Sequence, residues 1–367
     1  MATAPRKKLV KLPLSPRPIA SKPERLTPLD LLNQDLEAAA ALLTPAEVRY
    51  YCHRYYVIQD QRKRAASQIR ETLKVSEPNR LLLFDLQQSQ LHEKQIKITM
   101  LHNARSKMAG RWLLSIFGIG PVIAAGLLAH IDIAKAPTVG HIYNFAGLNP
   151  HINWMGRADV DAWVKAHAQE TGSLEDLLTL AAATFTRRYE TLYRDATTDL
   201  KTGASKPLTA TTVAAAIARR PWNAALKVLC WKAGESFKKF SNSPKDTLYG
   251  KLYREYKVYA VKKNISGQFA ELAQKTLAER KIADAKTLDT YRRGRLPDGR
   301  IDAWATRATT KILLSHLHHV LFELEYGQAP PMPFILAKEP LLHTRYMPPP
   351  NWPMNDSVEA EDIMEDE

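Results

Sequence analysis

The sequence predicts a mainly α-helical fold, in which a long antiparallel, coiled-coil-like helical hairpin is followed by a helical domain that contains a helix-hairpin-helix element. Three observations support this prediction. Apolar residues recur at steps of three and four over long stretches, which is the spacing of one helical face. Runs that alternate between apolar and polar residues, as strands require, are missing. Glycine is sparse at 15 of 367 residues, while the apolar share of 45% is large enough for a buried core.

Charge is distributed unevenly along the chain. There are 52 Lys and Arg against 38 Asp and Glu, a formal net charge of +14. Residues 351–367 contain seven acids and no Lys or Arg, so the remainder of the chain carries +21. A body this basic favours a polyanionic partner, and the acidic tail can compete with that partner for the same surface.

The composition argues against several classes of protein. Two cysteines, Cys52 and Cys230, are too few for a disulfide framework or a structural zinc site. No apolar run approaches the roughly 20 residues that span a bilayer. No apolar stretch follows the basic N-terminus, so a secretory signal is not expected. We therefore expect a cytoplasmic protein without a membrane segment, a metal site or a cofactor.

The chain divides into six segments by composition and pattern. The first holds five prolines among seven Lys and Arg, which prevents regular helix. It is interpreted either as a solubilising tail or as an arm that contacts phosphates without specificity. The segments are a flexible basic arm (1–27), a helical hairpin (28–111), a segment with the helix-hairpin-helix pattern (112–156), a helical insertion (157–216), a basic C-terminal helical region (217–335) and a Pro-rich, then acidic tail (336–367).

Two long helices are predicted to form the hairpin. Thr44-Pro45-Ala46-Glu47 has the pattern of a capping box with proline at the first helical position. Residues 76–79 break this helix, and a second helix is predicted over about 80–114. Such a pair can pack on itself or on a second copy, so we expect a homo-oligomer that assembles through residues 44–111.

The stretch 112–128 is the most informative part of the sequence. An apolar helix runs into Gly118-Ile119-Gly120, and a second helix begins with Pro121. The glycines permit close approach of a ligand, and the amides around Val122 and Ile123 would face an anion at the positive end of the helix dipole. This helix-hairpin-helix pattern grips a nucleic-acid phosphate without reading a base. The alternative is an ordinary tight turn with a packed core.

Two further stretches carry a resemblance to a known family. Ile142-Tyr143-Asn144-Phe145-Ala146-Gly147-Leu148-Asn149-Pro150 follows the glycine turn, and Tyr55-Tyr56-Val57-Ile58-Gln59-Asp60-Gln61-Arg62 lies in the hairpin. Together with the turn, they resemble the C-terminal transposase domain of the DEDD-type, bridge-RNA-guided insertion-sequence transposases, over residues 45–155 and 217–240. The resemblance implies DNA, with or without a guide RNA, as the partner. It also implies a role in DNA transposition or recombination and assembly through a coiled coil.

The sequence departs from this family in two ways. Family members begin with a ribonuclease-H-like domain whose four carboxylates hold divalent metal, whereas about 45 residues precede the hairpin here, too few for that fold. The family also places a catalytic serine a few residues after its Ala-Gly-Leu-x-Pro signature, but residues 151–157 offer no hydroxyl. Ser173 or Ser205 would substitute only if the insertion folded back. The catalytic residues are therefore unknown.

A basic segment opens the helix after the insertion. Arg219-Arg220-Pro221-Trp222 resembles the family's segment at this position, and the lysines that follow lie roughly opposite an apolar stripe. This face is interpreted either as a solvated lysine surface or as a phosphate contact, and Trp222 as a core anchor or a base-stacking platform. The predicted DNA-binding residues are Gly118, Ile119, Gly120, Val122, Arg219, Arg220, Lys227, Lys232, Lys238 and Lys239.

Two other clusters have both a chemical and a structural interpretation. Tyrosines and cations alternate over 249–263, which is typical of contact with single-stranded nucleic acid and equally of a helix with half-buried tyrosines. His316, His319 and Glu323 share a helical face on which a metal would bind, but structural histidines are favoured and no metal site is predicted.

Three hypotheses follow from these observations. The first is a transposase-like protein that binds DNA through backbone phosphates and lacks a complete catalytic site of its own. The second is an active DNA recombinase that uses an unrecognised nucleophile or works with a separately supplied catalytic domain. The third is a helical scaffolding protein whose basic face docks an acidic protein partner. Only the second hypothesis makes the chain an enzyme.

Overall fold

The computed structural model describes residues 34–149, 154–245, 247–332 and 347–354 of the chain. These ranges contain fifteen α-helices and one short 3-10 helix. Their β structure is limited to an isolated bridge between Thr198 and Ser205. The prediction of a mainly α-helical protein is confirmed. No helix in these ranges combines the length and apolar character that crossing a membrane requires.

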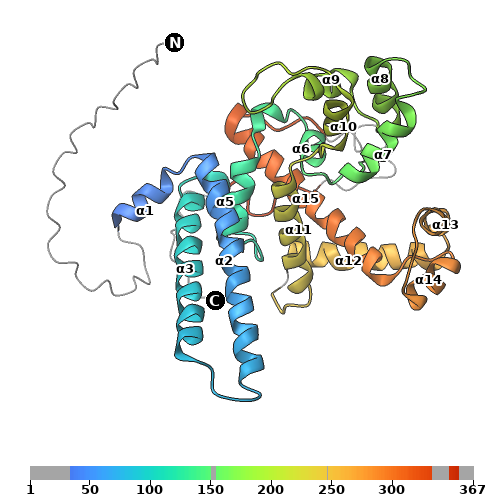
Figure 1. Cartoon of the computed structure of the whole chain (residues 1–367). Helices are drawn as coiled ribbons and strands as arrows, with labels where there is room; N and C mark the ends of the chain where they lie inside the picture. Colours follow the sequence, from blue (N-terminus) through green and yellow to red (C-terminus); the bar gives the residue numbers. More distant parts are fainter. Residues whose placement is uncertain (1–33, 150–153, 246, 333–346, 355–367) are drawn as a thin grey trace, which may run out of the picture.

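Helices α2 (Pro45–Thr72) and α3 (Arg80–Arg105) lie side by side and run in opposite directions (Figure 1). Thr44 N–H donates to Glu47 Oε2 at 2.8 Å, and the Thr44 hydroxyl accepts from Glu47 N–H, which completes the capping box. Asn79 caps α3 by accepting from the N–H of the second helical residue at 2.9 Å. These caps satisfy N–H groups that a first turn leaves unpaired, so both helices begin where the sequence predicts.

The second long helix ends earlier than the sequence pattern predicts. It stops at Arg105, and α4 (Met108–Leu114) follows after Lys107, whose backbone is extended with φ −121° and ψ 134°. A Cβ on Gly110 would lie 2.0 Å from the Ala104 carbonyl oxygen, so α4 packs closely onto the end of α3. The spacing of apolar residues in the sequence does not reveal this break, because the apolar residues on both sides of it pack into the same core.

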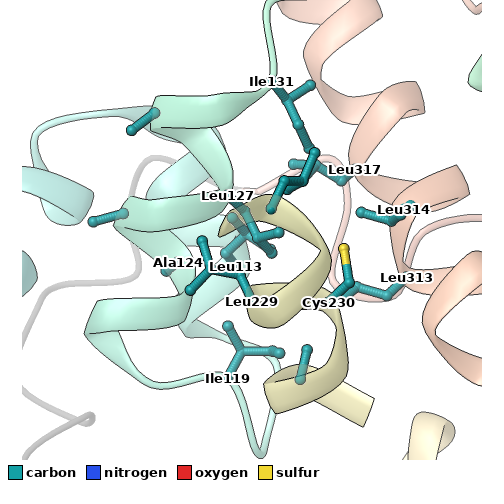
Figure 2. Packing of buried hydrophobic residues seen from close by; sticks show 14 of the residues in the cluster. Leu113, Ile119, Ala124, Leu127, Ile131, Leu229, Cys230, Leu313, Leu314 and Leu317 are labelled. Atoms are coloured by element: carbon teal, nitrogen blue, oxygen red, sulfur yellow. The ribbon is translucent and has the colours of Figure 1, made fainter. Parts of the chain in front are cut away.

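The central core joins the hairpin to helices from the second half of the chain. Helix α5 (Pro121–His130) packs against α2 and α3 and also against α11 (Ala224–Lys239). Helix α15 (Asp298–Tyr326) contacts α4, α11, α6 (Val139–Phe145) and α12 (Leu248–Ile265), and it also meets the short 3-10 helix η1 (Ile133–Lys135). Figure 2 shows the apolar side chains that meet between these helices, among them Leu113, Ile119, Ala124, Leu127, Ile131, Leu229, Cys230, Leu313, Leu314 and Leu317.

Two smaller helical groups have apolar cores of their own. The first consists of α7 (Arg157–His167), α8 (Leu174–Thr184), α9 (Tyr189–Thr197) and α10 (Ala210–Ala218). We call it the α7–α10 group. The second consists of α13 (Ala270–Glu279) and α14 (Ala285–Arg292), which pack near the ends of α12 and α15 (Figure 1).

The segment 347–354 lies against the central core. The indole N–H of Trp112 donates to the Pro350 carbonyl at 2.7 Å, and Asn351 Nδ2 donates to the Ser115 carbonyl at 3.2 Å. His316 Nε2 lies 3.1 Å from the Met347 carbonyl oxygen. These contacts tie the start of the acidic tail to α4 and α15.

Candidate nucleic-acid interface

The glycine turn before α5 requires glycine at one position and tolerates other residues at the second. Gly118 has a φ of +94°, in the left-handed region that L side chains rarely adopt. A Cβ on Gly118 would also lie 3.2 Å from Ser236 Oγ. Gly120 is extended, with φ −84° and ψ 170°, and a Cβ there would meet nothing within 4 Å. The backbone at Gly120 is therefore the part of the turn that a ligand can approach.

Some of the main-chain N–H and C=O groups of the turn already have hydrogen-bond partners within the protein. Ile123 N–H donates to the Gly120 carbonyl at 3.1 Å, so it is not the free donor that the sequence pattern suggests. The Gly118 carbonyl accepts from the Ser236 hydroxyl at 2.6 Å. The side chains of Ile119 and Val122 are buried in the central core. These two predicted site residues therefore offer a ligand only main-chain atoms.

Aromatic rings and lysines surround the turn. Phe117 and Phe240 meet edge to face with ring centroids 5.1 Å apart. Lys239 Nζ lies 5.1 Å from the centroid of Phe240, and Lys245 Nζ lies 5.5 Å from that of Phe117. Lys239 is thus the predicted lysine that the structure places beside the glycine turn.

The other predicted lysines of α11 have different neighbours. Lys232 Nζ lies 5.1 Å from the ring centroid of Tyr56 in α2. Lys238 Nζ pairs with Asp302 Oδ2 at 2.9 Å. Lys227 Nζ lies 4.1 Å from the ring centroid of Trp222, at the opposite end of α11 from Lys239. The predicted lysines therefore do not form one continuous surface, because each has different neighbours along α11.

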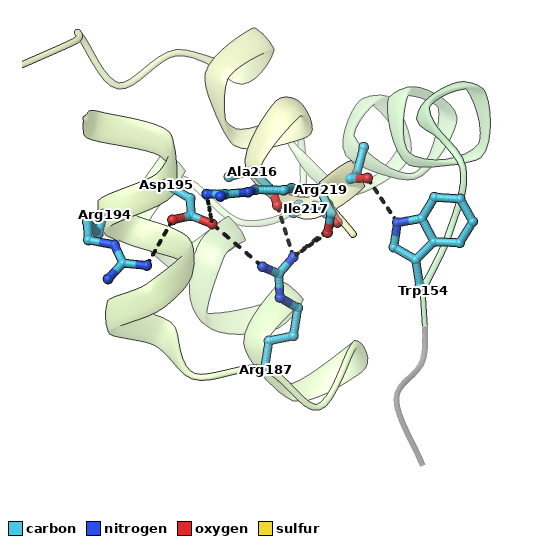
Figure 3. Close-up of polar contacts among 8 residues, drawn as sticks. Trp154, Arg187, Arg194, Asp195, Ala216, Ile217 and Arg219 are labelled. Atoms are coloured by element: carbon cyan, nitrogen blue, oxygen red, sulfur yellow. Dashed lines mark hydrogen bonds and ion pairs between the residues drawn. The ribbon is translucent and has the colours of Figure 1, made fainter. Parts of the chain in front are cut away.

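Arg219 belongs to an ionic cluster of the α7–α10 group. Its Nη1 lies 3.0 Å from Asp195 Oδ2, and Arg187 and Arg194 pair with the same carboxylate (Figure 3). The Asp195 side chain is only 3% exposed. Arg187 also donates to the carbonyl of Ala216, at the end of α10, at 2.9 Å. The local role of Arg219 is to help close the α7–α10 group.

Arg220 lies at the junction of the α7–α10 group with α11. Its guanidinium carbon is 5.3 Å from the centroid of a Trp154 ring. The Trp154 indole N–H donates to the Ala218 carbonyl at 2.9 Å (Figure 3), and the Trp154 and Trp222 rings meet edge to face at 5.7 Å. Arg220 therefore lies against Trp154, which itself packs on Trp222, just before α11 begins.

The Ala-Gly-Leu-Asn sequence positions the start of α11. Gly147 has a φ of +64°, and a Cβ there would lie 2.7 Å from Cγ of Trp222. Asn223 N–H donates to the Phe145 carbonyl at 2.8 Å. Ala146 is fully buried. Small residues are needed here because the Trp222 ring packs directly on the backbone of the turn.

A groove of about 550 Å³ runs between α11 and α15, from this turn towards the start of α15. Cations gather at its Trp222 end. Helix α11 contributes Lys227, and α15 contributes Arg307. The residues lining the groove are Gly147, Leu148, Asn149, Trp222, Lys227, Cys230, Trp231, Glu235, Lys238, Gly299, Asp302, Ala303, Thr306, Arg307 and Thr310.

Four cations at this end have no carboxylate within ion-pair distance in the described ranges: Arg220, Lys227, Arg307 and Lys311. We call them the cation cluster. Burial, together with Arg307 and Arg220, lowers the pKa of the Lys227 ammonium. Burial and Arg307 likewise lower the pKa of Lys311, whose Nζ lies 5.0 Å from the Tyr143 ring centroid. Mutual repulsion of this kind favours a bound anion.

Sequence reasoning missed two members of the cation cluster. Arg307 and Lys311 are four residues apart on α15, so they lie on one face of the helix. This spacing is visible in the sequence, but the apolar stripe of the same helix favours a role in the core. Their proximity to Lys227 depends on the packing of α11 against α15, which the sequence does not reveal.

The far end of the groove is occupied by an ionic network. Asp302 accepts from Lys238 at 2.9 Å, from Lys257 at 2.8 Å and from the Tyr253 hydroxyl at 2.9 Å. Burial alone would raise the pKa of Asp302, but these hydrogen bonds lower it to about 2. Burial and Asp302 raise the pKa of Tyr253, which is only 4% exposed. A buried, neutral hydroxyl of this kind is poorly placed to act as a nucleophile.

The remaining candidate chemical groups have structural partners. His316 accepts from the Tyr249 hydroxyl through Nδ1 at 2.8 Å and donates through Nε2 to the Met347 carbonyl. His319 pairs instead with Glu323 at 3.2 Å. Ser173 caps α8. Within the described ranges, no three His, Cys, Asp or Glu residues are grouped so that they could hold a metal ion.

Comparison with known proteins identifies one region of the chain. Residues 110–193 match the family described as Transposase IS116/IS110/IS902 family, and this range includes the glycine turn and the Ala146–Asn149 motif. Comparisons with curated proteins and with solved structures give no match. Residues 110–193 are therefore similar to the transposase domain of the IS116/IS110/IS902 family.

Proposed function

We propose that this protein binds DNA, alone or together with a guide RNA, during DNA transposition, through contacts to backbone phosphates. The transposase domain supports a role in transposition. The observation that carries the binding proposal is the cation cluster, which gathers beside the Ala146–Asn149 motif without a carboxylate partner in the described ranges. A phosphate is the ligand that best relieves the repulsion among these cations.

Two places along α11 are suited to phosphate contact. The cation cluster lies at the start of the helix, and the glycine turn with Lys239 lies at its end. The 16 residues of α11 span about 24 Å. This length corresponds to roughly seven base pairs of duplex. A bound strand that follows α11 would therefore contact both places.

The described residues support binding more than strand cleavage. Tyr253 is buried and its hydroxyl donates a hydrogen bond to Asp302, and Ser173 caps a helix. The Asp302 carboxylate is saturated by two lysines and this tyrosine, so it does not fit a divalent cation. We infer that the chain acts with a separately supplied catalytic domain if strand transfer takes place. Trapping of a covalent adduct between the purified chain and DNA would contradict this inference.

Salt-dependent binding tests the proposal. The measurement is the affinity for short duplex and single-stranded DNA and RNA over a range of NaCl concentrations. The slope of log K against log[salt] is negative, and the double variant Lys227→Ala/Arg307→Ala is expected to make it shallower by about 2. Each lost phosphate contact reduces the magnitude of the slope by about 0.9. The charge-matched control is Lys201→Ala/Lys286→Ala, which removes two exposed lysines outside the groove. An equal slope in all three proteins would overturn the proposal, as would tighter binding of an acidic protein than of any nucleic acid.

We also propose that the chain self-associates through residues 44–111. Large apolar side chains are exposed where α2 ends and α3 begins, far from the central core (Figure 1). They are Leu73, Val75, Leu81 and Phe84. Exposed apolar clusters of this kind mark interaction sites. Sedimentation analysis should show an oligomer that Val75→Asp/Leu81→Asp converts to a monomer, and a monomeric wild-type chain would contradict this.

A further inference from the structure

The groove between α11 and α15 changes in charge along its length. Lys227 and Arg307 line one end, and Glu235 lies further along α11 towards the other end. The helix rises about 12 Å between Lys227 and Glu235. Glu235 has no cation within ion-pair distance in the described part of the chain. One end is thus suited to a phosphate, and the other offers a carboxylate that accepts hydrogen bonds.

The groove also contains an unsatisfied hydroxyl. Thr306 is 5% exposed, and its Oγ1 has no hydrogen-bond partner within the described ranges. The neighbouring Thr310, by contrast, donates its hydroxyl to the Thr306 carbonyl at 2.9 Å. The methyl group of Thr306 packs on Gly234 of α11, where a Cβ would lie 2.4 Å from it. Buried polar groups without a partner are rare in folded proteins, and Thr306 lines the groove, so this hydroxyl is a candidate hydrogen-bonding group for a ligand there.

The walls of the groove include aromatic surface. The Trp231 residue is 55% exposed, and the Trp222 ring lies under Lys227 Nζ. Indole rings next to cations are surfaces on which nucleobases stack. The groove volume of about 550 Å³ lies within the range of small-molecule sites. Its size, its aromatic walls and its charge gradient all match a single nucleotide.

We propose that this groove receives one unpaired nucleotide of the bound strand. Its phosphate lies at Lys227 and Arg307, its base lies beside Trp231, and an exocyclic amino group of the base donates to Glu235. Cytosine carries such an amino group, whereas thymine presents a carbonyl at the same position. The inference rests on the proposed function, because it requires that a strand be bound. It adds a site that holds an extruded base and that prefers cytosine to thymine.

The test compares three short duplexes that are fully paired, carry one bulged cytosine, or carry one bulged thymine. Binding to the full chain is measured by fluorescence anisotropy at one salt concentration. We expect the cytosine bulge to bind about tenfold more tightly than the paired duplex and about fivefold more tightly than the thymine bulge. Free dCMP is a competitor in a parallel titration. Uptake of free dCMP without any bulge preference would overturn the proposal.

Three substitutions locate the effect in the groove. Ala303→Trp should fill the groove and abolish the bulge preference without weakening paired-duplex binding, because Ala303 is an exposed lining residue distinct from the cation cluster. The matched control, Ala285→Trp, places the same side chain on α14, outside the groove, and should retain the preference. Glu235→Gln should remove the discrimination between cytosine and thymine, since an amide can pair with either base.

Thr306→Val separates a ligand-binding role from a structural one. Valine has the same shape without the hydroxyl, so the thermal midpoint should stay equal or rise. Affinity for the cytosine bulge should fall several-fold, an effect that a purely structural threonine would not produce. Persistence of the bulge preference in Ala303→Trp would overturn the inference while leaving phosphate binding intact. Failure of the wild type to bind any duplex would instead overturn the proposed function, and this inference with it.

Discussion

The Trp222 indole packs directly on the backbone of Gly147, so closely that a Cβ on Gly147 would lie 2.7 Å from Cγ of the ring. The two residues are separated in sequence by the whole α7–α10 group. Their contact closes the base of that group and brings the Ala146–Asn149 motif against the start of α11. The cation cluster depends on this junction, because Lys227 Nζ lies 4.1 Å from the centroid of the same indole ring system.

Substitution at Gly147 should destabilise the protein more than the same change at a glycine with a similar φ. Gly172 has a φ of +66°, but a Cβ there would meet no atom within 4 Å, so Gly172→Ala carries backbone strain of about 1–2 kcal/mol alone. Gly147→Ala adds the clash with Trp222, and we expect a loss of about 3 kcal/mol or more. Urea denaturation of both variants measures the difference. Equal losses would show that the ring moves aside without cost.

Gly120→Val tests main-chain access at the glycine turn. The dihedrals of Gly120 suit any residue, and a Cβ there meets nothing within 4 Å, so the variant should fold with an unchanged thermal midpoint. Its side chain would hold a phosphate away from the backbone, so DNA affinity should fall. Gly118→Ala is a poorer probe, since its φ of +94° makes any loss of binding inseparable from strain. Full DNA affinity in folded Gly120→Val would exclude the turn as a phosphate contact.

The Asp195 carboxylate should be essential for the α7–α10 group. Arg187 is only 8% exposed, and Asp195→Asn would leave its charge uncompensated (Figure 3). We expect a loss of about 3–5 kcal/mol in unfolding free energy, the usual effect of breaking a buried pair. The control is Asp161→Asn, which breaks the exposed pair with Arg157 and should cost about 0–1 kcal/mol. Hydrogen exchange should show the Asp195→Asn loss within α7–α10, and equal protection in both variants would contradict the prediction.

Stability should fall as the pH is lowered from 7 to 5. Burial lowers the pKa of His316 to about 4, and burial with Arg49 lowers the pKa of His130 to about 4. An unfolded histidine titrates near 6.5, so between these values the unfolded chain binds more protons than the folded chain. Each residue therefore contributes stability above pH 6.5 that is lost as the pH falls, on the order of 2 kcal/mol at pH 5.

The substitution His316→Gln should flatten this pH profile, and His53→Gln, which replaces an exposed histidine, is the control for the substitution itself. The measurement is the urea midpoint at pH 8, 7, 6 and 5. The His316→Gln variant also weakens the contact with the Met347 carbonyl, so its stability at pH 8 provides the baseline for comparison. An unchanged slope in His316→Gln would show that the pKa of this histidine is the same in the folded and unfolded chains, and would contradict the prediction.

Removal of residues 355–367 should strengthen DNA binding at low salt. The seven acids of the tail follow directly on the segment 347–354, which the Trp112 and Asn351 hydrogen bonds hold against the core. A tethered polyanion competes with DNA at high local concentration, and this competition weakens as salt screens the charges. The control retains the tail length but replaces Asp and Glu with Asn and Gln. It should bind as tightly as the truncated chain, and wild-type affinity in both would contradict competition.

The sequence by itself determined the helical class and several local details. The capping box at Thr44, the break before Asn79 and the glycine turn before Pro121 follow from local backbone chemistry, so each lies where the pattern predicts. Periodicity could not reveal the break after Arg105, because α4 returns to the same core as α3.

Only the tertiary structure decided which cations act together. Lys238 and Arg219, two of the predicted DNA-binding residues, pair with Asp302 and Asp195, which are distant in sequence. Lys227 instead meets Arg307 of α15, a neighbour that no local pattern indicates. Charge partners are set by helix packing across long sequence separations, whereas caps and turns are set by residues a few positions apart. The sequence therefore predicted a basic helical protein, and the packing of α11 on α15 created its groove.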